Sequence, residues 1–568
     1  MLRRSAALAV AIPSAGFLLV AFLLPLGMVI QGGFVFSGRW TLEYVLSALN
    51  NPVYRAGWWT SLSIATGTTL LATLLALPLA WLSVRYEFPG RAWVTSAVLW
   101  PMVLPPFVGA LGLQQILGRY GALNALLGTT TDWLGIGRLH VVIVVQALAL
   151  FPIVWLNVSA SLANVDPSLE EAATVAGATA WRTFRHVTLP LIMPGLIAGA
   201  SLVFIWSFTE LGTPLMLGLS RCTPVQIYDG LKDIGMQPEP YALVALMLIG
   251  FAALFATVRV WNQRHAYASL SRSVQTRSPT RLRGWKGTAC LLPFVAVLAL
   301  ALLPHVGVIL TAVSDTGQWY RSVLPTRWTW THWADALGHE LTLRSIRNSL
   351  VYAGTAVALD LALALGISWV SARSHVPWRG WLDTLATLPL AVPGLVMAFG
   401  YLALSARLSH HPWVRSNPWL LSWLDVRESP ALFLVIAYAI RRLPYLVRAA
   451  AAGWSQVPPV LEEAAAVAGA SPARVVRTIT LPLIAAHLVG GAILTFAFCL
   501  LEVSDSLILA QRMDGYPVTK TIYELFALVG PGPHLAAALG AWAMAFLALS
   551  LAVASRLLGR NLGSLFRV

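Results

Sequence analysis

Four carboxylic acids stand inside stretches of the chain that are otherwise strongly apolar. Glu210 lies in FTELGTPLMLGL, Glu502 and Asp505 lie in LLEVSDSLILA, and Asp360 lies in VALDLALAL. A carboxylate in such surroundings faces the interior of the protein or a water-filled path, because hydrocarbon does not solvate it. Acids at the mouth of a path across a membrane favour a cationic cargo. These four residues are therefore candidates for a substrate pathway.

Glu210 and Glu502 occupy equivalent positions in two similar segments, 292 residues apart. Counting about 1.5 Å per residue from Pro190 places Glu210 roughly 30 Å along a helix, near the outer face of a membrane. The alternative is that Glu210 and Glu502 cap neighbouring helices and never meet a cargo. Asp360 has no counterpart, since Ala72 aligns with it. Acids of this kind also serve as proton sites in ion-coupled carriers.

Other residue types that carry chemistry form no recognisable site. The three cysteines have no metal-ligand spacing, so we expect no metal. The phosphate-binding sequence GxxxxGK[ST] does not occur, and no soluble stretch is long enough to hold a nucleotide-binding domain. We therefore expect no catalytic site and no bound cofactor, and any ATP must be used by a separate subunit. The net charge is +15, but the basic residues fall in short strings between apolar runs rather than in one patch, which argues against nucleic acid.

A polar, alanine-rich string occurs twice. Residues 169–190 read LEEAATVAGATAWRTFRHVTLP, and residues 461–482 read LEEAAAVAGASPARVVRTITLP. Both copies share a Glu-Ala-Ala, a glycine after three further residues, and a final Leu-Pro. These positions are Glu171, Ala172, Ala173, Gly177, Leu189 and Pro190 in the first copy and Glu463, Ala464, Ala465, Gly469, Leu481 and Pro482 in the second.

Each string predicts a short helix that lies parallel to the membrane. Prolines before it suit a first helical turn, and the acids stand near the positive end of the helix dipole. The alanines keep one face small, so that the backbone of another protein can approach, and the glycine can end or bend the helix. A surface helix resting on lipid headgroups is the alternative for a single copy. The repetition of every shared position favours a docking function.

Long apolar helices must carry these residues. Only 11% of the chain is charged and 58% is hydrophobic, against about 25% charged residues in a soluble domain. Runs long enough to cross roughly 30 Å of hydrocarbon predict an all-α integral membrane protein with twelve spans. We expect them near 7–30, 58–84, 93–117, 140–162, 189–213, 240–262, 288–312, 347–371, 382–407, 430–452, 481–508 and 535–558.

The chain is also an internal duplication. The segment ending in LAWLSVR aligns with the one ending in ISWVSAR at an offset of 288, which places Arg85 on Arg373. Six spans in each half give parallel repeats that enter the membrane in the same direction. We predict a first domain at 1–262, a basic cytoplasmic linker at 263–286 and a second domain at 287–568. The basic residues gather on one side if both termini are cytoplasmic, and each repeated string then lies in the cytoplasm between the fourth and fifth spans.

The repeated string resembles the EAA–Gly–LP loop that marks permease subunits of bacterial ATP-binding-cassette importers. The resemblance covers nearly the whole chain and implies an inner-membrane transport protein, not an enzyme. It implies about twelve transmembrane helices in two six-helix repeats, each with a cytoplasmic coupling helix. It also implies that the two loops contact two copies of a separate ATPase subunit, and that a periplasmic binding protein delivers the solute.

The resemblance also suggests a cargo. Fused double-domain permeases of this length resemble the branch that imports ferric iron, and PLAVPGLVMAFGYLAL and VTKTIYEL are most similar to that type. Thiamine, polyamines and aminoethylphosphonate are alternatives within the same class. A twelve-span secondary transporter driven by an ion gradient is the alternative from another class, but it gives no reason for the duplicated loops.

Overall fold

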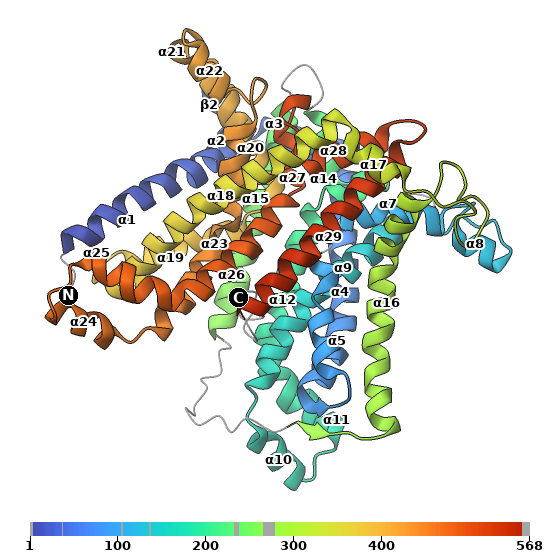
Figure 1. Cartoon of the computed structure of the whole chain (residues 1–568), viewed down its shortest axis with the longest axis horizontal. Coiled ribbons are helices and arrows are strands. Elements are labelled where there is room, and N and C mark those ends of the chain that lie inside the picture. Colours follow the sequence, from blue (N-terminus) through green and yellow to red (C-terminus); the bar gives the residue numbers. More distant parts are fainter. Residues whose placement is uncertain are drawn as a thin grey trace. The chain divides into compact units, whose positions relative to one another are not determined.

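A computed structural model describes residues 4–36, 38–103, 106–135, 138–231, 238–264 and 279–558. Almost all regular structure in these residues is helical, as predicted. The strands have two residues each: β1 (Val35–Phe36) pairs antiparallel with β2 (Arg39–Trp40), and β3 (Tyr86–Glu87) pairs parallel with β4 (Thr280–Arg281). The helices form two compact units (Figure 1).

The first unit contains Met1–Asn51, Ile227–Leu248 and Trp330–Leu565. Its helices are α1 (Arg4–Leu18), η1 (Leu19–Leu23), α2 (Leu24–Phe34), α3 (Glu43–Asn50), α17 (Thr331–Gly338), α18 (Glu340–Arg373), α19 (Arg379–Thr387), η3 (Leu388–Ala391), α20 (Gly394–Ser409), α21 (Pro412–Arg415), α22 (Pro418–Leu424), α23 (Ala431–Gln456), α24 (Pro459–Val467), α25 (Pro472–Val475), η4 (Val476–Thr480), α26 (Leu481–Leu500), α27 (Ser504–Leu509), η5 (Met513–Gly515), α28 (Val518–Ala527) and α29 (Gly532–Leu558).

The second unit contains Pro52–Gln226 and Ile249–Thr329. Its helices are α4 (Pro52–Arg85), α5 (Arg91–Ala97), α6 (Trp100–Val103), α7 (Pro106–Leu117), α8 (Ala122–Leu127), α9 (Leu139–Ala163), α10 (Pro167–Val175), α11 (Ala180–Thr183), η2 (Phe184–Thr188), α12 (Leu189–Thr209), α13 (Gly212–Met216) and α16 (Trp285–Val313). Helices α14 (Thr223–Gly230) and α15 (Pro238–Arg264) are divided between the two units.

The first helix of each sequence repeat belongs to the unit that the other repeat builds. In the first unit α1 packs on α18 and α2 on α20, and in the second unit α16 packs on α7. Gly112 and Gly400, 288 residues apart, make these contacts close: a Cβ on Gly112 would meet the α16 backbone, and one on Gly400 would meet the carbonyl oxygen of Pro25 at 2.7 Å. The predicted boundaries therefore describe sequence repeats that exchange a helix. The predicted linker lies largely outside the described residues.

Each predicted span has a helical counterpart among the described residues, but three of these counterparts are not simple apolar helices. Nine of them are long and apolar enough to cross a membrane, or eleven if each of two bent pairs counts as one span. The predicted span 382–407 is broken, because α19 and η3 meet α20 at 104° beside prolines, which cannot donate a helical hydrogen bond. The predicted span 93–117 is likewise divided among α5, α6 and α7. The predicted span 430–452 is one helix, α23, but it carries three arginines and is not among the nine.

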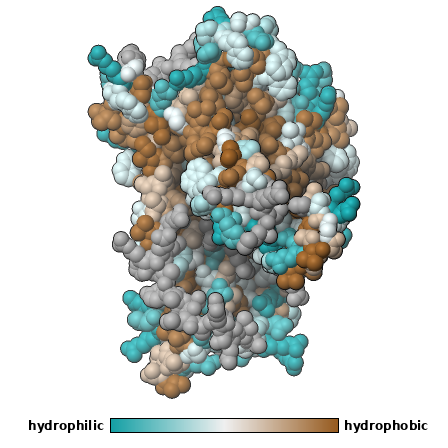
Figure 2. Space-filling model, turned by 90° about the vertical axis from the view of Figure 1, so that its left-hand side faces the viewer, coloured by the Kyte–Doolittle hydropathy of each residue, from teal (hydrophilic) through white to brown (hydrophobic). Residues whose placement is uncertain are grey.

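The lateral surface is apolar, as contact with lipid requires. Large side chains stand exposed along the long helices, for example Ile12 on α1 and Leu70 and Leu74 on α4. Figure 2, which looks onto the left-hand side of Figure 1, shows hydrophobic residues across much of the upper half of the visible face and hydrophilic residues at its upper and lower ends. A soluble protein rarely exposes continuous apolar surface of this extent. The described residues thus form an integral membrane fold.

Candidate functional site

Both copies of the repeated string begin with a short helix. Helices α10 and α24 have nine residues each and start 292 residues apart. A proline stands in the first turn of each, together with Glu170 or Glu462, where the helix dipole favours an acid. Asp166 caps α10 by accepting a hydrogen bond from the backbone N–H of Ser168 at 2.9 Å. The predicted short helices are confirmed, and Figure 1 shows α10 beyond the ends of α4 and α12.

Gly177 and Gly469 end these helices in the left-handed conformation, with φ of +83° and +85°. The N–H of Gly177 donates to the carbonyl oxygen of Thr174 and the N–H of Ala178 to that of Ala173, both at 2.9 Å. The second copy repeats both bonds at 3.0 Å. This is the Schellman arrangement, in which glycine avoids the strain that a side chain would cause. No described atom lies within 4 Å of a Cβ built on either glycine, so the backbone angle, rather than space, requires glycine.

The other predicted docking positions face outward to the same degree in both copies. Glu171 and Ala172 are exposed and Ala173 is half-buried, and the second copy has the same pattern at Glu463, Ala464 and Ala465. The last residue of each helix is a valine, Val175 or Val467, with about nine-tenths of its surface exposed: 89% and 90%. Each helix thus presents small, acidic and apolar side chains together on one open face.

The Leu-Pro pairs join these helices to the membrane. Helix α12 begins at Leu189 and α26 at Leu481, whereas the apolar helical runs that contain them begin at Ala180 and Ala473. A π-helical turn of five residues precedes each start, η2 in the first copy and η4 in the second. The N–H of Leu189 bonds to the carbonyl oxygen of Phe184, and that of Leu481 to Val476. Single π turns are rare and often mark functional positions.

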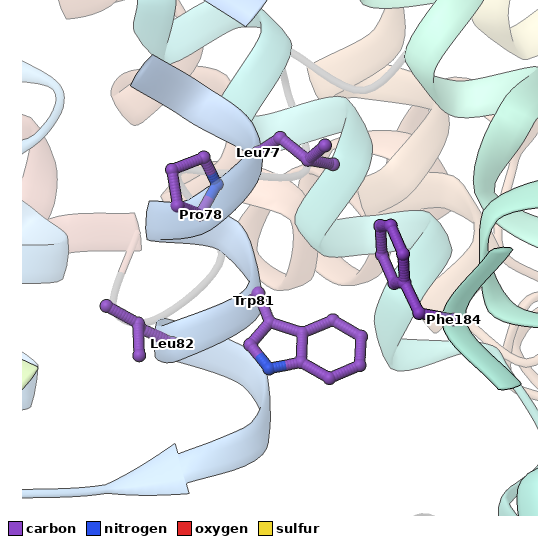
Figure 3. A pocket seen from close by; sticks show the side chains of 5 residues that line it. All are labelled: Leu77, Pro78, Trp81, Leu82 and Phe184. Carbon is purple, nitrogen blue, oxygen red and sulfur yellow. The ribbon is translucent and has the colours of Figure 1, made fainter. Parts of the chain in front are cut away.

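A buried carboxylate fastens α10 to the transmembrane helices. Glu170 forms an ion pair with Arg85, the last residue of α4, and accepts a hydrogen bond from the hydroxyl of Thr188 at 2.6 Å. The Arg85 guanidinium also lies 5.1 Å from the centre of the Trp81 ring. Trp81 and Phe184 meet edge to face at 5.5 Å, beside an apolar cavity of about 360 Å³ (Figure 3).

The second repeat forms the same Arg–Glu–Thr cluster. Glu462 accepts a hydrogen bond from Nε of Arg373, the last residue of α18, at 2.9 Å, and from the hydroxyl of Thr480 at 2.8 Å. Arg373 also donates to the carbonyl oxygen of Val457 at 2.7 Å and lies 5.4 Å from the ring centre of Trp454.

The sequence analysis selected the second glutamate of each LEEAA and missed the first. The signal was present, because all three members of the cluster recur at the repeat offsets: Arg85 with Arg373, Glu170 with Glu462, and Thr188 with Thr480.

Glu210 caps a neighbouring helix. It follows the last residue of α12 and accepts hydrogen bonds from the N–H of Thr213 at 2.8 and 3.1 Å. The side-chain amide of Gln146 donates to it at 3.3 Å, while the hydroxyl of Ser207 donates to Gln146 at 2.5 Å. This is the capping arrangement that the sequence left open as an alternative. Contact between Glu210 and a cargo stays a prediction.

Glu502 and Asp505 are paired with arginines of α23. Glu502 forms ion pairs with both Arg441 and Arg442, and Asp505 accepts from Arg441 at 3.2 Å. The acids are 5% and 0% exposed, whereas the arginines are 20% and 13% exposed. The more accessible groups of this cluster are therefore guanidinium groups, which weakens the argument that its acids select a cation.

Asp360 lies in the middle of α18 and is fully buried. Neither of its carboxylate oxygens has a hydrogen-bond partner among the described residues, although Asp360 and Arg442 interact electrostatically. The equivalent Ala72 is also fully buried. Among the described residues, including Asp360, no group of three His, Cys, Asp or Glu side chains is placed to hold a metal ion.

A duplicated bundle of membrane helices with a matched surface helix in each repeat is the organisation of a transport permease. The chain belongs to the family of binding-protein-dependent transport system inner membrane components, whose profile matches residues 72–266 and 362–567. It is thus a multi-pass inner-membrane permease of the ATP-binding-cassette importer class, a transport component rather than an enzyme. One match in each half confirms the duplicated permease that the repeated loops indicated.

Relatives with known names differ in their cargo. The ferric transport system permease protein FbpB of Actinobacillus pleuropneumoniae is 25% identical over 81% of this chain and 64% of its own length. A Haemophilus influenzae protein, provisionally named ferric transport permease FbpB 1, is 26% identical over 82% of this chain and 70% of its own length. The molybdenum transport system permease ModB of Haemophilus influenzae is 32% identical over 37% of this chain and 94% of its own length.

Proposed function

We propose that this permease imports ferric iron from a periplasmic binding protein, driven by two copies of a separate ATPase that dock on α10 and α24. The observation that supports this proposal is the match between the two helices, which share length, exposed face, glycine end and π turn. ATP is used by the partner subunit, and both termini and both helices lie in the cytoplasm. A single chain with two such helices serves two ATPase copies without a second permease.

The docking surface consists of the exposed positions of the repeated string. Glu171 and Glu463 offer a charge to a basic residue of the ATPase, while the alanines allow its backbone to approach. Val175 and Val467 supply apolar contact, because each side chain is almost entirely exposed and gains by burial. Closure of the two ATPases moves both helices, and the continuous path through η2 and η4 carries this movement into α12 and α26.

The ferric cargo is supported by the relatives that align with more than four-fifths of this chain in one alignment. Glu210 lies directly after α12, and its carboxylate is the type of oxygen ligand that hard cations prefer. Thiamine, polyamines and aminoethylphosphonate are alternatives within the class. An oxyanion such as molybdate is a second candidate, favoured by the arginines beside Glu502, which are 20% and 13% exposed, and by the molybdenum permease relatives.

Uptake assays in a deletion strain separate these cargoes. Cells that lack the permease are complemented with the chain and given labelled ferric iron, thiamine, putrescine, aminoethylphosphonate or molybdate. We expect iron uptake alone to depend on the permease and to disappear without its ATPase. Molybdate uptake in place of iron uptake would establish the second candidate. Uptake that survives loss of the ATPase but stops with a proton uncoupler would point instead to a secondary transporter.

A further inference from the structure

We propose that Glu170 and Glu462 are positioning residues that hold the two coupling helices to the transmembrane bundle, so that movement of the short helix moves two long helices. The inference rests on the proposed docking function, but it concerns a different side of the helix. Docking uses the exposed face with Glu171 and Glu463, whereas positioning uses the adjacent glutamate on the inner face.

Little besides the carboxylate attaches these helices to the bundle. Within α10 the buried residues are Pro167 and Glu170, and no residue of α24 is fully buried. The Glu462 side chain is 17% exposed. A nine-residue helix with so little apolar burial has no core of its own that could fix its orientation. Its direction therefore depends on the hydrogen bonds of the glutamate.

Each glutamate bonds to two long helices at once. In the second unit Glu170 is paired with Arg85 at the end of α4 and with Thr188 immediately before α12. A displacement of α10 is thereby passed to α4, which has no direct chain connection to it, as well as to α12. Without the carboxylate, the described contacts would leave α10 with the packing of Pro167 and its two backbone links, through residues 164–166 and 176–179. A short helix can pivot about such links.

The Arg–Glu–Thr cluster occurs in both repeats, but the aromatic side chain beside its arginine differs. Arg85 lies against Trp81 of its own helix, whereas Arg373 lies against Trp454 of another helix. The neighbouring aromatic contact differs, whereas the carboxylate has an arginine and a threonine as partners in both copies. Arginine and threonine share one oxygen of Glu170 but bond to different oxygens of Glu462. An ion pair with one partner removed is costly where it is buried, so each arginine also needs its glutamate.

Spin-label distances within the chain test the inference without any partner protein. One label is placed at Val175 on α10 and another at Glu87 beyond the end of α4, both exposed, after replacement of the three cysteines by alanine. In nanodiscs we expect one narrow distance distribution, and a broad one after Glu170→Gln. The matched control is Glu171→Gln, the same change on the outer face, which we expect to leave the distribution narrow. A narrow distribution in the Glu170→Gln chain would overturn the inference.

The transport readout separates this role from docking. In proteoliposomes with the ATPase and binding protein, we expect the double variant Glu170→Gln/Glu462→Gln to retain the ATPase on purification but to lose about tenfold in uptake per ATP hydrolysed, since two charge-assisted bonds are weakened in each repeat. Replacement of both Arg85 and Glu170 by methionine should restore thermal stability without restoring uptake. Full uptake in this methionine variant would also overturn the inference. An ATPase that fails to bind the wild-type chain would refute the proposed function, and the label distances would still decide the positioning role.

Discussion

Gly177 and Gly469 allow the shape of the coupling helices to be tested separately from their surface. Each has φ above +80°, a conformation that strains an L residue by about 1–2 kcal/mol. No described atom would contact a Cβ at either position. The change Gly177→Ala therefore opposes the backbone conformation without creating a clash within the chain.

The size of the effect follows from that strain. A cost of about 1–2 kcal/mol lowers the population of the Schellman end relative to a frayed end by about 5- to 30-fold. Since a frayed end changes the direction of the following turn, we expect ATP-driven uptake to fall by a similar factor in Gly177→Ala, and further in the double variant Gly177→Ala/Gly469→Ala. A branched side chain, as in Gly177→Val, should be worse because β-branched residues tolerate positive φ least.

Asparagine separates conformation from bulk. It is larger than alanine but adopts the left-handed conformation more readily, so we expect Gly177→Asn to retain more uptake than Gly177→Ala. The assay measures uptake and ATP hydrolysis together in proteoliposomes, and Gly354→Ala is the control. Gly354 lies within α18 with ordinary helical φ and open space around it, so alanine should preserve uptake and stabilise the helix by about 0.5–1 kcal/mol. If asparagine were the more harmful change, close packing of the ATPase on a bare glycine, and not backbone shape, would govern these positions.

Four further substitutions test contacts inside the bundles. Gly112→Ala should lower the thermal unfolding midpoint, because its methyl group would overlap the α16 backbone; an unchanged midpoint would contradict the close contact. Glu502→Ala removes the ion pair of Arg442 and leaves Arg441 with Asp505 alone, which should cost about 3–5 kcal/mol. Glu210→Gln keeps a capping acceptor and should cost less than about 1 kcal/mol; denaturant unfolding compares the two variants, and equal losses would refute the distinction. Asp360→Ala copies the first repeat and should preserve or raise the unfolding midpoint, while uptake at equal expression shows whether the carboxylate serves the cargo.

The membrane fold and the coupling helices were predictable because their signals are local. Apolar runs define long helices, and the positions shared by the two strings define a short helix that ends at Gly177 or Gly469. The exchange of α2 and α16 was not predictable, since nothing in either sequence states which bundle a helix joins. The sequence contains two glycines that permit this exchange, Gly112 and Gly400. Each allows the backbone of another helix to pack closely, and the structure identifies that helix.

The choice between adjacent glutamates depended on direction around the helix. Successive residues of an α-helix point about 100° apart, so one glutamate of each pair faces the bundle when the other faces solvent. The sequence does not show which glutamate faces the bundle, because that depends on the positions of Arg85 and Arg373 at the ends of α4 and α18. The pairing of Glu502 with Arg441 and Arg442 is tertiary in the same way. Those arginines stand within the predicted span 430–452, and the sequence of that span does not identify their partner.

The two repeats are alike at the coupling helices and unlike where the intramembrane acids lie. The partners of the Arg–Glu–Thr cluster, the glycine end and the π turn recur in both repeats, and the proposed docking of two identical subunits would require this match. The acids differ: Glu210 is bonded to an amide and a backbone N–H, whereas Glu502 is bonded to two arginines. A single cargo passing through has no two-fold symmetry to preserve, so this part of the repeats was free to diverge. The residues that distinguish one cargo from another are therefore to be sought where the repeats differ, and those that couple transport to ATP where they agree.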